Sequence, residues 1–204
     1  MRYITNHLVY TSDFILEIFP ITGAFTNFDT KNSKWVLCEG EFQNKTTKVN
    51  GTFAACTSSD FSIKGKGIVI KTPGYCIAEE FITSVNANQY GHLSYIDGCS
   101  NTGLIGPVRN GFPCINYLYF PENTKQTIHT HPSCRIGMIL NGSGEAEVNG
   151  KIFELNTGDL FLLDKFTKHR FLTNKSHMSL MVFHPDSEDG PKDEFNPMKS
   201  RTYF

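Results

Sequence analysis

Three histidines in the second half of the chain have the residue type and the spacing of a metal site. His129 and His131 are separated by one residue, and His169 follows a strand-like run and a short turn. Alternate side chains of a β-strand point to one face, so His129 and His131 would lie side by side, roughly 6.5 to 7 Å apart at their Cα atoms. Neutral imidazole suits zinc, copper, iron and nickel, and leaves coordination positions open for water or substrate. We therefore expect these three side chains to bind one divalent transition metal ion.

The residues around the first two histidines resemble the first sequence motif of the cupin superfamily. His129 and His131 fill its HxH positions, and Gly142 closes it. Asn123 stands where cupins have Gly, a substitution that a turn tolerates because Asn also adopts left-handed geometry. Arg135 stands where cupins have Glu. The resemblance therefore gives no carboxylate ligand at this position.

The second cupin motif is matched by the residues that lead to the third histidine. Gly150 opens this motif, Asn156 replaces its Pro, and Gly158 keeps its turn. His169 then supplies the metal ligand that the motif expects. The resemblance extends over residues 121–171, about a quarter of the chain.

The two motifs, at residues 123–142 and 150–169, imply a cupin-type β-barrel, which is also called a double-stranded β-helix or jelly roll. The resemblance implies a metal-dependent enzyme, with Fe(II) as the favoured ion and Mn, Ni, Zn and Cu as alternatives. Cupin dioxygenases with three histidines bind an anionic substrate on a ferrous centre that takes O₂ at an open position. The expected function is thus a dioxygenase-type oxidoreductase acting on a small anionic organic molecule. A non-catalytic cupin that binds or senses a small molecule, and a cupin lyase or isomerase, are the alternatives.

Arg135 is the position where the sequence departs most from the cupin pattern. Three neutral histidines leave a divalent ion its full charge, and Arg135 would add a further positive charge beside it. Such a site favours a carboxylate, an enolate or a catecholate, and a guanidinium can hold a carboxylate with two hydrogen bonds. We expect Arg135 to bind the substrate and to act in catalysis. The alternative is that a protein carboxylate balances its charge, with Glu145, Glu147 and Asp159 as the nearest candidates in sequence.

Two tyrosines just before the HxH are further candidates for substrate binding. Tyr117 and Tyr119 lie on a predicted strand and share one of its faces. This face could line the substrate cavity. The alternative is that both are ordinary strand aromatics, which β-strands favour.

The composition describes one globular unit, or two small ones, with 39% hydrophobic residues and a formal net charge of −1. With 19 basic and 20 acidic residues and no basic stripe, the sequence predicts no binding to nucleic acid. No apolar signal segment occurs at the amino terminus and no run of 18 apolar residues occurs anywhere, so we predict neither secretion nor a membrane span. The six cysteines are dispersed without a CxxC pair, which favours free thiols in the cytoplasm.

Strand signals dominate the chain, and no stretch sustains helical periodicity for three turns. Short runs rich in Val, Ile, Phe and Tyr alternate with turns of Gly, Asn, Pro or Ser, which predicts an all-β sandwich or barrel. The predicted strands are residues 14–19, 35–42, 52–56, 67–72, 76–83, 114–120, 135–140, 145–148, 160–163 and 178–183. Residues 96–107 are dense in turn formers and are predicted to be a linker.

A weak internal repeat appears at an offset of about a hundred residues, where Val36–Gly40 aligns with Met138–Gly142. We predict three regions. Residues 1–100 are a β-rich region, either a degenerate, metal-free cupin-like half or extra strands around a single barrel. Residues 110–185 are the metal-binding cupin domain, and residues 186–204 are a C-terminal tail.

The sequence also predicts that the protein is a homodimer. Open β-barrels leave strand edges that need covering, and most soluble oligomers are symmetric homodimers. Apolar side chains near both termini, such as Phe14, Ile15 and Phe204, could supply the contact.

Overall fold

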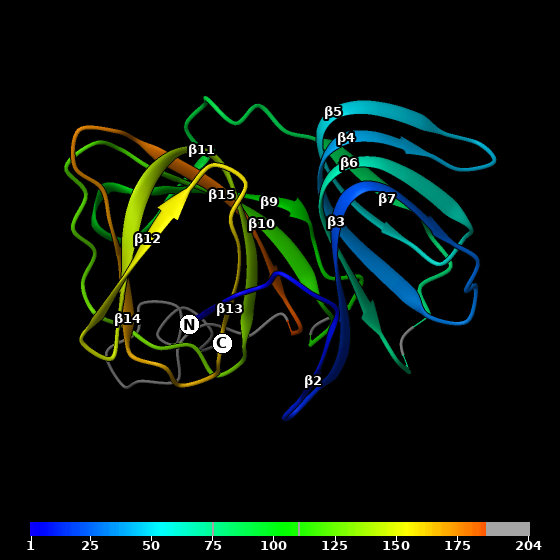
Figure 1. Ribbon diagram of the computed structural model, residues 1–204, viewed down its shortest axis with the longest axis horizontal. Coiled ribbons are helices and arrows are strands. Elements are labelled where there is room, and N and C mark those ends of the chain that lie inside the picture. Colours follow the sequence, from blue (N-terminus) through cyan, green and yellow to red (C-terminus); the bar gives the residue numbers. More distant parts are fainter. Residues whose placement is uncertain (75, 110, 187–204) are drawn as a thin grey trace, which may run out of the picture.

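The protein is described by a computed structural model over residues 1–74, 76–109 and 111–186, and its strands form two curved sheets that lie side by side (Figure 1). The tail predicted over residues 186–204 lies, beyond Asp186, outside the described residues. The architecture is all-β, as predicted, and it has the jelly-roll form of cupins. No helix in the described part of the chain is both long and apolar enough to cross a membrane.

The first sheet is built from a contiguous part of the chain. It has six strands in the order β2 (Leu8–Thr11), β3 (Ile15–Asn27), β6 (Phe61–Thr72), β4 (Ser33–Gln43), β5 (Lys48–Thr57) and β7 (Phe81–Ser84). All pairs of neighbouring strands in it are antiparallel. The strand β2 lies at one end of this order, and Val9 and Ile15 beside that edge are exposed. The predicted homodimer stays a prediction, to be checked by light scattering, and this edge is the surface that a second copy would cover.

The second sheet has nine strands and contains Arg135, His169, Tyr117 and Tyr119, whereas His129 and His131 lie in the segment between β10 and β11. Its main order is β1 (Arg2–Tyr3), β13 (Leu160–Leu163), β11 (Arg135–Val148), β15 (Met178–His184), β10 (Cys114–Phe120), β9 (Ser100–Ile105) and β8 (Leu93–Ser94). Two further strands, β12 (Lys151–Asn156) and β14 (His169–Leu172), pair with the second half of β11. A short 3-10 helix, Ile96–Gly98, precedes β9.

Apolar clusters occupy both faces of the nine-stranded sheet. One cluster, which we call the sheet interface, packs Tyr117, Ile136 and Phe183 against the six-stranded sheet, where the Trp35 ring lies 5.6 Å from the Phe183 ring between centroids. The opposite face, which we call the interior face, is enclosed because the sheet curls over it. Its apolar cluster contains Leu118, Phe120, Ile139, Val148, Phe171, Leu180 and Val182. Side chains on the interior face point into the space that the sheet encloses, whereas those of the sheet interface pack against the six-stranded sheet.

Four glycines lie in register across the centre of the six-stranded sheet. Gly23 on β3 pairs with Gly65 on β6, Gly65 pairs with Gly40 on β4, and Gly40 pairs with Gly51 on β5. A Cβ atom on Gly65 would lie 2.2 Å from the carbonyl oxygen of Glu39, and one on Gly40 would lie 2.3 Å from that of Lys64. Glycine in a strand marks close backbone approach and sharp bending. This row accounts for the strong curvature of the four strands (Figure 1).

The two halves of the chain are not separate in the sheets. The early strand β1 pairs with β13, and β8 and β9 extend the nine-stranded sheet beyond β10. The linker predicted over residues 96–107 is wrong in part, because residues 100–105 form β9. The sequence of β9 was interpreted as a linker because it contains turn formers such as Asn101 and Gly103. Whether residues 1–100 are a degenerate cupin-like half or extra strands stays a prediction, as do the boundaries of the three regions.

Candidate metal centre

The structure brings together His129, His131 and His169. Their potential ligand nitrogens all lie within 4.8 Å of one another. The ring centroids are 5.0 Å apart for His129 and His131, 4.4 Å for His129 and His169, and 5.2 Å for His131 and His169. His169 is buried, and the other two rings are partly exposed. The group therefore has the donor type, the proximity and the access that a metal ion needs.

Backbone hydrogen bonds hold the three histidines in place. His129 and His169 form an isolated antiparallel bridge, in which each N–H donates to the carbonyl oxygen of the other at 2.9 Å. The N–H of Phe166 donates to the carbonyl oxygen of His131 at 2.7 Å. Phe166 has a φ of 55°, which is uncommon for a bulky residue and marks a constrained turn. The strand-like segment with the HxH is thus fastened to the turn before β14, and the spacing of the rings follows from this pairing.

The side-chain hydrogen bonds of two of the rings leave Nε2 available to a metal ion. Nδ1 of His129 lies 2.9 Å from the carbonyl oxygen of Thr127, and Nδ1 of His169 lies 2.8 Å from that of Thr167. A carbonyl oxygen can only accept, so Nδ1 carries the proton and donates in each case. The remaining Nε2 atom of each ring then keeps its lone pair, which is the arrangement found in metal-binding histidines. The peptide N–H of Thr127 is itself held by Asp97, whose carboxylate accepts it at 2.5 Å.

Burial keeps His129 and His169 neutral. Burial, together with the neighbouring His129, His131 and Arg135, lowers the pKa of His169 to about 3 against the opposing hydrogen bond to Thr167. Burial also lowers the pKa of His129. Metal ions compete with protons for the same lone pair, so low histidine pKa values favour metal binding at neutral pH.

The low pKa of His169 predicts that the metal-free protein loses stability in mild acid. An unfolded histidine takes up a proton near pH 6.5, but His169 in the folded protein resists it down to about pH 3. Its contribution is therefore complete above pH 6.5 and is lost as the pH falls toward 3. The melting temperature of the chelator-treated protein should fall from pH 7 to pH 5, and less steeply for His169→Phe. Equal slopes for the two proteins would contradict this assignment.

Arg135 is buried on the interior face of β11. Its neighbour Ile136 pairs with Phe183 and belongs to the sheet interface, so Arg135 points the other way. Its side chain is 4% exposed, and Nη1 donates to Oγ of Ser133 at 2.6 Å and to the carbonyl oxygen of Cys134 at 3.0 Å. Ser133 Oγ in turn donates to Oδ1 of Asp186 at 2.7 Å. Arg135 is thus positioned on the same face as the histidines.

None of the three acidic residues considered as alternative partners of Arg135 has a described contact with it, and two of them interact elsewhere. Glu147 forms an ion pair with Arg170 at 2.6 Å, and Asp159 accepts a hydrogen bond from the backbone N–H of Asn156 at 2.7 Å. Glu145 is exposed. The described hydrogen bonds connect Arg135 to a different carboxylate, that of Asp186, with the hydroxyl of Ser133 between them.

Tyr117 and Tyr119 are not brought to the histidines. Both belong to the sheet interface, whereas Leu118 and Phe120 between and beyond them lie on the interior face. Tyr117 donates its hydroxyl to the carbonyl oxygen of Gln89 at 2.7 Å, and the Tyr119 ring stacks on His177. Their positions therefore correct the expectation that this face of β10 lines the substrate site. The strand was predicted correctly, but the sequence did not reveal which of its faces is the interior one.

Sequence reasoning also missed polar residues on the interior face. His184 ends β15, and because Ile136 pairs with Phe183, it lies next to Arg135. Asn116 on β10 approaches it, with Nδ2 3.5 Å from Nε2 of His184. The alternation of β15 could have identified His184, because Leu180 and Val182 share its parity and lie on the interior face.

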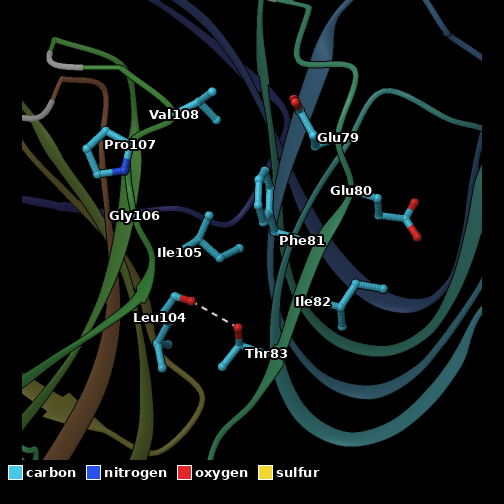
Figure 2. A pocket seen from close by; sticks show the side chains of 10 residues that line it. All are labelled: Glu79, Glu80, Phe81, Ile82, Thr83, Leu104, Ile105, Gly106, Pro107 and Val108. Carbon is cyan, nitrogen blue, oxygen red and sulfur yellow. Dashed lines mark hydrogen bonds between the residues drawn. The ribbon is translucent and has the colours of Figure 1, made fainter.

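The cysteines and a cleft beside β7 lie outside this chemistry. All six cysteines are free, and burial raises the pKa of the Cys134 thiol to about 12, which makes it an unreactive core residue. A cleft of about 540 Å³ separates β7 from the end of β9, with Thr83 donating to the carbonyl oxygen of Leu104 at 2.9 Å across it (Figure 2). None of the predicted site residues lines this cleft.

Comparisons with known proteins agree with this fold. A family model described as "Cupin domain" matches residues 116–184. A search of curated proteins gave no match. Among solved structures, a cupin 2 conserved barrel domain protein from Leptotrichia buccalis is similar with a TM-score of 0.60 and 14% identity, over 91% of this chain and 89% of the other.

Two further solved structures show the same likeness at low identity. A mutant of salicylate 1,2-dioxygenase from Pseudoaminobacter salicylatoxidans in complex with gentisate has a TM-score of 0.60 and 9% identity, over 88% of this chain and 74% of the other. A putative glyoxylate induced protein from Pseudomonas aeruginosa has a TM-score of 0.60 and 15% identity, over 93% and 82%. Residues 116–184 therefore form a cupin domain, and the fold of the chain is similar to that of cupin proteins.

Proposed function

We propose that the protein is a metal-dependent cupin enzyme, a dioxygenase-type oxidoreductase that acts on a small anionic organic molecule. The observation that carries this proposal is the group of three clustered histidines, two of which have Nδ1 hydrogen-bonded to a carbonyl oxygen and Nε2 left for a metal ion. The described residues of this group include no carboxylate ligand, and Arg135 stands where the cupin motif has one.

The donor set fits a borderline transition metal better than Mg²⁺ or Ca²⁺, which prefer oxygen ligands. His129, His131 and His169 would hold it, and Fe(II) is our preferred ion. Bound there, ferrous iron supplies the capacity to activate O₂. The protein's own residues bury His169 and keep Nε2 of His129 and His169 deprotonated.

Arg135 supports an anionic substrate. A neutral ligand set leaves the ion its full 2+ charge, and a buried guanidinium adds to the positive potential on the interior face. A carboxylate is therefore attracted more strongly here than in water, and Arg135 can orient it through its fork of donors. The structure of salicylate 1,2-dioxygenase with gentisate is consistent with this chemistry, because that similar protein is seen with an organic acid. We further propose a cytoplasmic location, in keeping with six free cysteines.

The test is oxygen consumption by the iron-loaded protein with a panel of small carboxylates and catechols. We expect O₂ uptake with at least one acid, and a weaker affinity for that acid in Arg135→Gln and Arg135→Lys, by about tenfold or more, with the metal retained. Arg170→Gln is the control, since Arg170 forms a half-buried ion pair with Glu147 and points to the opposite face of β14 from His169. Binding without O₂ uptake would favour a non-catalytic binding protein. Loss of the metal or of the fold in both Arg135 variants would make Arg135 structural and contradict an anion-binding role.

A further inference from the structure

Four adjacent strands of the nine-stranded sheet each present one polar side chain to the interior face. In strand order these are Arg135 on β11, His184 on β15, Asn116 on β10 and Asn101 on β9. Their orientation follows from the register. Asn101 pairs with Leu118 of the interior cluster, and cross-strand partners share a face.

This row lies beside the histidines. The segment that leads to His129 runs along the start of β9, where Nε2 of Gln126 contacts Sγ of Cys99 and the N–H of Thr127 donates to Asp97. At the other end of the row, burial lowers the pKa of His184 well below its usual value, and the nearby Arg135 and His131 lower it further. The interior face is thus apolar at one end and polar where it meets the metal ligands.

Asn101 carries an unsatisfied group. Its Oδ1 atom is buried and has no hydrogen-bond partner among the described residues. A buried carbonyl oxygen without a donor is costly, and such an atom in a native protein indicates a ligand or a water that supplies the donor. The interior face therefore contains an acceptor, Oδ1 of Asn101, that a hydroxyl or amine group of a ligand could satisfy.

Space for such a group is present next to Asn116. Its cross-strand partner is Gly103, and a Cβ atom there would meet nothing closer than Oδ1 of Asn116, at 3.8 Å. Gly103 is exposed, so this space opens to solvent. A glycine in a strand often marks a place where a ligand approaches the backbone.

We propose that Asn101, Asn116 and His184 bind hydroxyl groups of the substrate, so that the substrate is a hydroxylated carboxylic acid. The inference rests on the proposed function and narrows its substrate class. The carboxylate belongs to the metal and Arg135. The neutral amides and imidazole each offer both a donor and an acceptor, which matches a hydroxyl and gives no advantage to a second charge.

The test uses pairs of acids that differ by one hydroxyl, lactate with propionate and salicylate with benzoate. Affinities are measured by calorimetry on the iron-loaded protein without oxygen. We expect at least one hydroxy acid to bind about tenfold or more tightly than its partner, because a site built for a hydroxyl leaves buried groups unpaired without it. This ratio should collapse in Asn101→Leu and in His184→Leu.

A second readout separates binding from a structural role. Asn101→Leu removes an unsatisfied buried acceptor, so its melting temperature should be equal to or higher than that of the wild type. Thr102→Val, next to it on the opposite face of β9, should leave the ratio unchanged. A wild-type ratio of one, or a ratio unaffected by both variants, would overturn the inference while carboxylate binding through Arg135 still supports the proposed function. If the iron-loaded protein binds no acid of either pair and none of the function panel, the proposed function fails, and this inference with it.

Discussion

His131→Ala is expected to abolish stoichiometric metal binding and, with it, oxygen consumption. The three ring nitrogens act on one ion, so the loss of one leaves a two-histidine site with little hold on a divalent metal. Removing a group that only supports a ligand costs 10- to 100-fold in affinity, so removal of a ligand itself should cost about 100-fold or more. The measurement is the metal content of purified protein by mass spectrometry, together with its affinity in a chelator competition.

The control for this variant is His92→Ala. His92 is exposed and lies outside both motifs, so this variant should keep the metal content of the wild type. His131 is partly exposed, and His131→Ala keeps the backbone carbonyl that accepts from Phe166, so this variant should keep the circular dichroism of the folded protein. A folded His131→Ala protein that still carries one equivalent of metal would exclude this group as the metal centre.

Gly65→Ala should have the largest effect on stability. The added methyl group would lie 2.2 Å from the carbonyl oxygen of Glu39 and 2.8 Å from Cα of Gly40, and both contacts are with backbone that cannot swing away. We expect a loss of about 3 kcal/mol or more in the free energy of unfolding, which lowers the melting temperature by roughly 10 °C. Thermal denaturation followed by circular dichroism measures both.

Gly106→Ala is the matched control for Gly65→Ala. Nothing lies within 4 Å of a Cβ atom at Gly106, and its φ is not in the left-handed region. This variant should melt within about 2 °C of the wild type. If Gly65→Ala melts like Gly106→Ala, the glycine row does not set the curvature of the six-stranded sheet.

The metal centre could be anticipated because its signals are local. The HxH spacing places two rings on one face whatever the fold, and the cupin motif places His169 opposite them. Asn123, which stands for a motif glycine, has a φ of 58°, so the turn has the left-handed geometry that the motif requires. Local rules of turn and strand were enough for these positions.

The environment of the centre could not be anticipated, because it depends on pairings between distant segments. Tyr117 was placed on the wrong side of its strand, since parity divides a strand into two faces without saying which is enclosed. The positions of His184 and Asn101 on the interior face follow only from their neighbours Arg135 and Leu118, which lie on other strands. The sequence alone does not give these pairings. The strand β9 was hidden by its polar, glycine-containing sequence, which resembles a linker when its partner strand is unknown.

The pairing of β1 with β13 has a consequence for the order of folding. Arg2 pairs with Leu162, 160 positions later, whereas the six-stranded sheet uses only residues between Leu8 and Ser84. Contacts that are close in sequence form faster because they close shorter loops. A nascent chain on the ribosome can thus complete the six-stranded sheet before Leu160 has been made. The nine-stranded sheet must wait until β15 has been made and then recruit β1, so the three histidines come together only after the six-stranded sheet can form.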